Sequence, residues 1–377
     1  MTAAPTPAAP PHLAAIDAMR GYAILGVVLT HAGQWTKPTS EWAVQLCRNG
    51  ALGVQLFFVA SAFALFLSNE TRRPAERRPV ADFFVRRFFR VAPMFYVGLV
   101  GFVLLVGLGP RFWAPRGLDS AHVMLTALFL HGWHPETINS VVPGGWSIAA
   151  ETSFYLLLPL LFKFVPTRAW ALRLLVITLV LGPLMNAWLA PLLTPNYPAR
   201  FAYLAENFKF FWIFGELPVF ACGILLYYLQ RESRDRPDRR IGWACLAAFL
   251  LSAGALFWQM PPVLPPSLFV TAAYGTAFLL FGLALHHLRS PLLVNPLVVF
   301  FGKISYSLYF VHFAVMQFFY LQWHDGLPFD GPLVTPLAFL MLLIVAGAIS
   351  WATWQAIELP GIALGRRLVA RLEARVS

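Results

Sequence analysis

The chain has 377 residues, of which 59% are hydrophobic, 15% are aromatic and only 12% are charged, and its formal net charge is +11. An average soluble domain carries roughly 25% charged residues, so this composition excludes a soluble globular protein and indicates a polytopic membrane protein. The arginines lie in short segments between long apolar runs, which is the pattern that orients membrane proteins. We therefore expect a lipid bilayer as the surroundings and no nucleic-acid partner.

The first apolar run carries three ionisable residues, Asp17, Arg20 and His31. The Ala/Pro-rich residues before it lack the basic start of a signal peptide, so we expect a disordered tail at 1–13 and a retained first span. Eleven helical steps separate Arg20 from His31, which advances the chain by about 16 Å and returns it to nearly the same face. Ionisable side chains in a membrane helix normally face the protein interior, so the three predict a buried functional site.

Apolar stretches of sufficient length predict ten spans. They cover residues 14–33, 50–69, 89–109, 146–165, 170–190, 208–229, 241–259, 267–287, 297–321 and 333–357. An eleventh stretch, 121–131, has about half the usual length and is interpreted as a re-entrant or interfacial helix. The fold expected is all-α and polytopic, with one transmembrane domain over 14–360 and a short basic cytoplasmic tail over 361–377.

The distribution of Lys and Arg between the loops predicts the orientation of the spans in the membrane. Ten spans place twenty Lys and Arg residues in the loops assigned to the cytoplasm and six on the opposite side, which predicts that both termini are cytoplasmic. The six outer cations are Lys37, Arg48, Arg111, Arg116, Arg200 and Lys209. Three cysteines, Cys47, Cys222 and Cys245, are too widely spaced for a metal site and are interpreted as packing residues.

The expected topology gives the remaining polar residues definite depths. His31 lies near the outer end of the first span, and Glu151 lies about 7 Å inward of Trp146 at the outer start of the fourth, so both belong to one outer layer. In the ninth span, three polar residues four and seven positions apart share one face: Ser305, Tyr309 and His312. At the inner mouth of the third span, Arg86 and Arg90 are one turn apart beside Arg87. Arginine binds phosphate with two hydrogen bonds, although such a cluster also serves as a membrane anchor.

Five motifs in chain order resemble those of acyltransferase family 3, over about residues 14–360. They are Asp17…Arg20-Gly21…His31, the block from Gly50 to Ser61, the stretch from Arg86 to Pro93, Trp146-Ser147…Glu151…Tyr155…Pro159, and the block from Gly302 to His312. Two positions depart from the family pattern, because Ala18 and Ala62 stand where the family usually has Gly. Alanine is still small, so helix packing should survive.

The resemblance implies transfer of an acyl group, usually acetyl from cytoplasmic acetyl-CoA, to a hydroxyl of an extracytoplasmic saccharide or glycan. It implies a bacterial inner (cytoplasmic) membrane location, acyl-CoA as the donor substrate, and no tightly bound cofactor or metal. Some members carry a C-terminal esterase-like domain, which we do not expect here because the chain ends about 20 residues after the last span. The acceptor, the choice between acetyl and succinyl, and the oligomeric state stay open.

The chemistry of these side chains predicts roles within that reaction. His31 would act as general base toward the acceptor hydroxyl or carry the acyl group itself, with Glu151 stabilising the imidazolium and Asp17 as a third catalytic candidate. The residues expected to bind the donor are Arg20, Arg86, Arg87, Arg90 and Ser61. The residues expected to bind the acceptor or the thioester are Trp146, Tyr155, Ser305, Tyr309 and His312.

Two other classes fit parts of the pattern. Ten spans with polar residues near the midplane also describe a secondary transporter that exports a glycan, a lipid-linked sugar or a small acid, although the two halves show no clear repeat. A non-catalytic scaffold or sensor is disfavoured by the titratable residues on interior faces.

Overall fold

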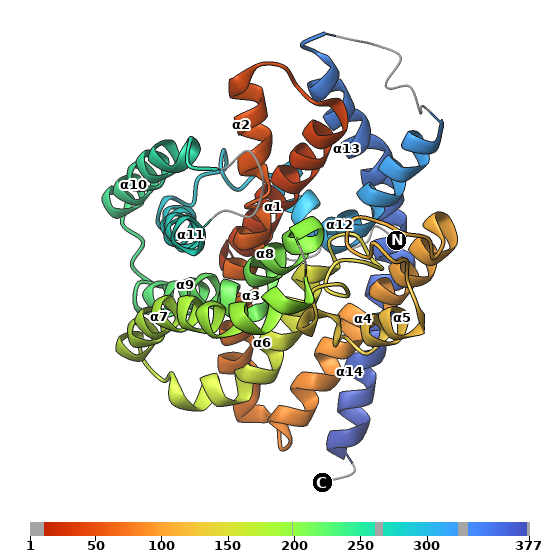
Figure 1. The fold of residues 1–377 in the computed structure, drawn as a ribbon. Helices are drawn as coiled ribbons and strands as arrows, with labels where there is room; N and C mark the ends of the chain where they lie inside the picture. The colour runs from red at the N-terminus through yellow and green to blue at the C-terminus, as the bar shows by residue number, and fades with distance from the viewer. Residues whose placement is uncertain (1–10, 198, 261–266, 323–330, 375–377) are drawn as a thin grey trace, which may run out of the picture.

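The computed structural model describes residues 11–197, 199–260, 267–322 and 331–374, and within these ranges the chain is almost entirely helical, with no β-strand (Figure 1). The α-helices are α1 (Pro11–Thr36), α2 (Glu41–Gly50), α3 (Gly53–Arg72), α4 (Pro79–Val106), α5 (Ser120–Ala127), α6 (Gly145–Phe164), α7 (Arg168–Leu193), α8 (Ala202–Phe211), α9 (Ile213–Glu232), α10 (Arg239–Phe257), α11 (Leu268–Leu288), α12 (Pro296–Gln322), α13 (Val334–Thr353) and α14 (Leu359–Ala374).

Helix α1 lies at the centre of the bundle. It packs against α2, α3, α11, α12 and α13, and Figure 1 shows it running through the middle of the molecule. Its contact with α12 is especially close, because a Cβ added to Gly302 of α12 would lie 1.8 Å from the backbone oxygen of Asp17. Small residues at such a contact let two helix backbones approach, so the glycine fixes how α1 and α12 meet.

A second group of helices surrounds α9. It packs against α3, α7 and α11, while α10 packs against α11 at the edge of the bundle. The outer helices α7 and α10 expose large apolar side chains, such as Val176 and Leu251. Apolar surface of this kind suits contact with lipid tails, which places α7 and α10 at the periphery and α1, α3 and α9 in the protein interior.

All ten expected spans lie on helices. By length and apolarity, eight helical segments of the described residues qualify as membrane spans, or nine when the two halves of α12 count as one. Those halves meet at an angle of 76° between Lys303 and Ser305. Helix α1 is not among the nine, since it carries polar residues such as Asp17, Arg20 and His31. Helix α1 is enclosed by other helices and therefore does not need an apolar surface. The chain as a whole is an all-α multi-pass membrane protein.

The stretch expected at 121–131 contains a short helix. Helix α5 is eight residues long and begins at a capping box, in which the side chain of Asp119 accepts a hydrogen bond from the backbone N–H of His122. A second short turn, a 3₁₀ helix at His131–Trp133, follows it. At about 1.5 Å per residue, neither crosses a bilayer.

Both ends of the chain were expected to be tails outside the membrane domain. Residues 1–10 lie outside the described residues, and helix α1 already begins at Pro11. At the other end, most of the expected basic tail at 361–377 is helix α14, which packs along α4 at the lower end of the molecule in Figure 1. The Glu373 carboxylate accepts hydrogen bonds from the backbone N–H groups of Arg77 (3.1 Å) and Arg78 (3.0 Å). The contact therefore holds α14 against the start of α4.

Candidate active site

Two cavities meet inside the bundle. The first is narrow, with a volume of about 80 Å³, and the second is wide, with a volume of about 1370 Å³. Val54 of α3 and Tyr309 of α12 line both of them. The two cavities therefore share an edge, which we call the junction, formed by these two side chains.

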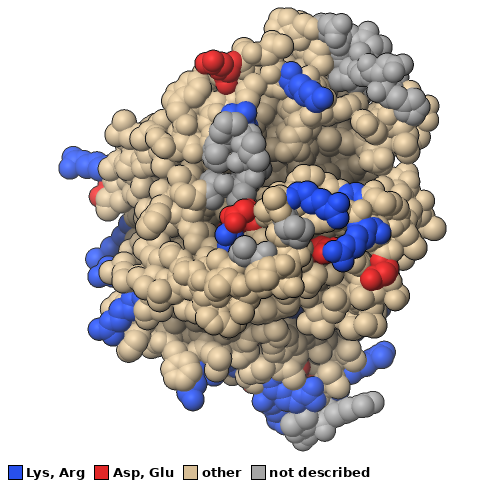
Figure 2. Space-filling view, in the orientation of Figure 1, with Lys and Arg blue, Asp and Glu red and all other residues tan. Residues whose placement is uncertain are grey.

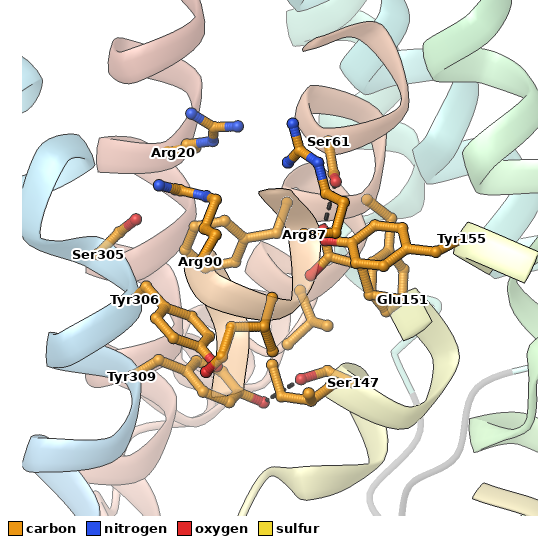
Figure 3. A pocket seen from close by; sticks show the side chains of 15 residues that line it. Arg20, Ser61, Arg87, Arg90, Ser147, Glu151, Tyr155, Ser305, Tyr306 and Tyr309 are labelled. Atoms are coloured by element: carbon orange, nitrogen blue, oxygen red, sulfur yellow. Dashed lines mark hydrogen bonds between the residues drawn. The ribbon is translucent and has the colours of Figure 1, made fainter. Parts of the chain in front are cut away.

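The narrow cavity has a cationic end. Three arginines from two helices line it, Arg20 of α1 with Arg87 and Arg90 of α4, and Figure 3 shows their guanidinium groups gathered at one end. The Arg87 guanidinium lies 5.9 Å from the ring centres of both Phe83 and Tyr155. Contact with two aromatic faces holds it in place, and its Nε has no hydrogen-bond partner among the described residues.

A single carboxylate faces these arginines across the cavity. Glu151 of α6 lines the same space and accepts a hydrogen bond from the Ser61 hydroxyl of α3 (Figure 3). Ser305 of α12 also lines the cavity, just after the bend in that helix. Since Arg20 is paired with Asp17 at 3.7 Å, Arg87 and Arg90 remain opposite the one lining carboxylate, an arrangement that suits a phosphate-bearing ligand.

The junction is held by a hydroxyl cluster. Tyr309 donates a hydrogen bond to the backbone oxygen of Gly144 (3.0 Å) and accepts one from the Ser147 hydroxyl (2.9 Å), at the end of the cavity opposite the arginines in Figure 3. Gly144 has φ +74°, and a Cβ there would lie 2.7 Å from the Tyr309 hydroxyl oxygen. Only glycine fits this backbone and this close approach, so the turn before α6 fixes the position of Tyr309.

His31 lines the wide cavity. Its Nδ1 lies 2.8 Å from the amide oxygen of Gln34, and its ring lies 5.3 Å from that of His312, measured between ring centres. Since an amide oxygen only accepts, Nδ1 carries the proton and Nε2 keeps its lone pair. The His312 ring lies 6.1 Å from the ring of Tyr309, so His31 is linked to the junction through packed rings.

Aromatic and cationic side chains complete the wide cavity. Trp146 of α6 lines it beside Phe210 and Phe211 of α8. The other polar and aromatic lining residues include Lys37, Arg48, Arg111, Phe112, Trp113, Asn139, Tyr203, Glu206 and Asn207. Flat aromatic faces with hydrogen-bonding groups around them form the kind of surface on which a polar cyclic ligand can stack.

The structure does not bring Glu151 to His31. The expected common outer layer is wrong, because Glu151 lines the narrow cavity with the arginines whereas His31 lines only the wide one. The expectation placed Glu151 by counting residues from Trp146, but the two side chains leave α6 toward different cavities. With this placement Glu151 cannot stabilise a His31 imidazolium by direct contact.

Three further residues lie elsewhere than expected. Arg86 lines neither cavity, since its two guanidinium nitrogens bind the carboxylate of Glu76 at 2.6 and 3.1 Å. Asp17 also lines neither, and it instead lies 3.7 Å from Arg20 as an ion-pair partner. His312 is fully buried behind His31, with Nδ1 bonded to the Leu308 backbone oxygen (2.8 Å) and Nε2 unpartnered among the described residues.

Some lining residues had no individual prediction. Tyr306 of α12 and Ser147 of α6 line the narrow cavity from within two of the quoted motifs. Both lie within the quoted motifs, but helical spacing favoured Ser305, Tyr309 and His312 as the inner face of the ninth span. Tyr306 follows Ser305 just after the bend in α12. Arg111 reaches the wide cavity from a loop, where no periodic pattern applies.

Comparison with known proteins gives one consistent class. The family model of acyltransferase family 3, described as an acyltransferase domain, matches residues 13–354. The chain is 27% identical over 311 residues to a Komagataeibacter xylinus protein named "Putative membrane-bound transacylase BcsY", covering 79% of this chain and 71% of that protein. It is 25% identical over 373 residues to "Acyltransferase MdmB" of Streptomyces mycarofaciens, covering 89% of each.

A more distant similarity points the same way. The chain is 22% identical over 364 residues to a Staphylococcus aureus (strain COL) protein named "Putative O-acetyltransferase SACOL0978", covering 84% of this chain and 52% of that protein. No solved structure matches the chain.

Proposed function

Because the chain belongs to acyltransferase family 3 and is a multi-pass membrane protein, we propose that it moves an acyl group, acetyl in the first instance, from cytoplasmic acyl-CoA to a saccharide hydroxyl across a bacterial inner membrane. The observation that carries this proposal is the junction, where a narrow cationic cavity meets a wide cavity that holds a histidine. The two substrates of an acyl transfer need two such spaces that meet at one point.

The narrow cavity is the proposed donor site. Arg20, Arg87 and Arg90 would bind the phosphates of CoA, since guanidinium groups form paired, charge-assisted hydrogen bonds with phosphate oxygens. The cavity between these arginines and Tyr309 is narrow and lined by apolar side chains such as Val54 and Phe57, which suits the extended arm that carries the thioester. The acyl group would then reach the junction.

The wide cavity is the proposed acceptor site, with His31 as general base. Nε2 of His31 takes the proton of the acceptor hydroxyl while that oxygen attacks the thioester carbonyl carbon. The carbon–sulfur bond breaks, the thiolate of CoA leaves and receives the proton from His31, and an ester remains on the saccharide. The hydrogen bond from Nδ1 to Gln34 holds the ring in the tautomer that this step requires.

The experiment uses the purified chain in nanodiscs with acetyl-CoA and crude envelope glycan. We expect CoA release and glycan acetylation by the wild type. His31→Gln should lower kcat by roughly 10²- to 10⁴-fold, the usual contribution of a general base, and leave acetyl-CoA binding intact. If His31 instead carried the acyl group, a burst of CoA release and an acyl-histidine adduct would appear without any glycan.

A matched pair on α4 tests the donor site. Arg90→Gln should raise the KM for acetyl-CoA by roughly tenfold or more, because it removes a phosphate ligand. Arg86→Gln removes the same charge one turn away, from a side chain that binds Glu76, and should leave that KM unchanged. A folded protein that neither binds acetyl-CoA nor releases CoA would overturn the proposal and favour a transporter.

A further inference from the structure

The wide cavity contains more positive charge than its own residues neutralise. Lys37, Arg48 and Arg111 line it, together with one acidic residue, Glu206. Glu206 is already paired with Lys209, at 2.7 Å. None of the three lining cations forms an ion pair among the residues that the structure describes, so an excess positive charge faces the cavity.

The contacts of these cations are with neutral groups. Arg111 donates to the backbone oxygens of Gly107 (2.5 Å) and Ser140 (3.4 Å), and Arg48 lies 3.5 Å from the amide oxygen of Gln45. Carbonyl groups orient a guanidinium without cancelling its charge. Lys37 follows α1 with φ +51°, a left-handed conformation that favours glycine, so a charged residue stands at a position that tolerates side chains poorly.

The distribution of these cations is uneven. The sequence places six Lys and Arg residues on the outer side, and three of them line this one cavity. Figure 2 shows a hollow in the upper half of the molecular face, with Lys or Arg side chains above and below it. Charges of one sign along a recess with low-dielectric walls concentrate their field there and attract ions of the opposite sign. A neutral saccharide could accept hydrogen bonds from these side chains but would gain no attraction from their net charge.

We propose that the acceptor is an anionic saccharide, whose carboxylate or phosphate groups bind Lys37, Arg48 and Arg111 while its rings stack on the aromatic side chains of the wide cavity. This inference rests on the proposed acyl transfer for the identity of the ligand as an acceptor. The arginine fork favours planar, two-oxygen anions, and the anion holds the sugar so that one hydroxyl faces His31.

The experiment compares two probes of the same length, an oligogalacturonate and its methyl ester, in which each carboxylate is replaced by an uncharged ester with one additional methyl group. Binding is measured by calorimetry on the full chain in zwitterionic nanodiscs saturated with CoA, so that the narrow cavity cannot bind the probe and no turnover is needed. We expect the acid to bind roughly tenfold or more tightly than the ester, and the difference to shrink in about 0.5 M salt.

Variants assign that difference to the cavity. The double variant Lys37→Gln/Arg48→Gln should lose most of the preference for the acid, keep only the share that Arg111 contributes, and still bind CoA. Arg116→Gln removes an exposed cation that does not line the cavity, and it should keep the wild-type preference for the acid. Arg111 is left unchanged, since its hydrogen bonds to backbone oxygens tie it to the fold.

The outcomes are distinct. Equal binding of acid and ester by the wild type, or a preference that is undiminished in the double variant, would overturn the anionic acceptor. Loss of CoA binding by the wild type would instead contradict the proposed donor site, and the double variant would then still assign any preference for the acid to the wide cavity. A preference for the acid that falls in the double variant and not in Arg116→Gln supports the inference.

Discussion

Adjacent arginines on α4 have different partners. Arg86 forms a two-contact ion pair with Glu76, whereas Arg87 and Arg90, three residues apart, face the narrow cavity. Residues at i and i+3 lie on the same side of a helix, as do residues at i and i+4, so spacing alone cannot choose between Arg86–Arg90 and Arg87–Arg90. The choice depends on Glu76, which the preceding turn brings back to Arg86.

A residue outside the membrane spans gives a prediction for pH. His131 is buried in the turn before α6, its Nε2 lies 3.0 Å from the Gly145 backbone oxygen, and burial lowers its pKa to about 4. The unfolded chain has a histidine pKa near 6.5, so it binds more protons than the folded chain as the pH falls below that value. Stability should therefore fall by about 2 kcal/mol between pH 7 and pH 5 on account of this group.

The measurement is the melting temperature of the detergent-solubilised protein over that pH range. His131→Gln retains a donor for the Gly145 oxygen but does not titrate in this range, so its melting temperature should fall less than that of the wild type on acidification. An equal decrease in both proteins would show that other groups cause the acid sensitivity.

Sequence reasoning identified most polar residues of the narrow cavity but few residues of the wide one, and it did not identify their grouping. Arg20, Ser61, Arg87, Arg90, Glu151, Tyr155, Ser305 and Tyr309 all line the narrow cavity, and five separate motifs contain them. Glu151 and His31 were assigned to one layer because depth along a helix follows from residue count, whereas the direction of a side chain depends on which neighbours pack against each face. The ion pair between Arg86 and Glu76 is likewise a tertiary contact, which residue spacing on one helix does not predict.

Helix α12 shows how an element shapes the site. Its halves meet at 76° beside Ser305, and Gly302 packs against the Asp17 backbone of α1 just before the bend. Gly21 of α1 makes a second close contact, since a Cβ there would lie 2.0 Å from the Val298 backbone oxygen. These contacts fix Arg20 of α1 and Ser305 of α12 on neighbouring walls of one cavity. Apolarity predicts the length of both helices, but neither the bend nor the contact between them.

The α1–α12 contact can be tested with a methyl group. Gly302→Ala places a Cβ 1.8 Å from the Asp17 oxygen, so the helices must separate, which we expect to cost about 3 kcal/mol and to weaken acetyl-CoA binding. Gly254→Ala on the outer helix α10 meets no atom within 4 Å and serves as the control. Melting temperature and acetyl-CoA affinity are measured on both, and an unchanged Gly302→Ala protein would contradict the packing described.

At the scale of the whole molecule, the two cavities lie toward opposite ends. Gly361 and Gly365 of α14 pack on Phe89 of α4, next to Arg87 and Arg90, so the narrow cavity lies toward the α14 end. The wide cavity is lined by Lys37, just beyond the end of α1, and by Arg48 of α2, at the other end in Figure 1. The expected positive-inside orientation makes the α14 end cytoplasmic.

This arrangement predicts a strict sidedness for the reaction. In proteoliposomes, acceptor acetylation should occur when acetyl-CoA is on the α14 side and the saccharide is on the opposite side. It should be absent when both substrates are on the same side of the membrane, whichever side that is. The fraction of each orientation is measured by protease access to a tag after α14. Because Val54 and Tyr309 separate the two cavities, only the acyl group passes the junction, and CoA should be recovered entirely on the side where acetyl-CoA was supplied. Acetylation with both substrates on one side would mean that the two cavities open to the same face, and transfer across the membrane would then be wrong even if His31 and Arg90 act as proposed.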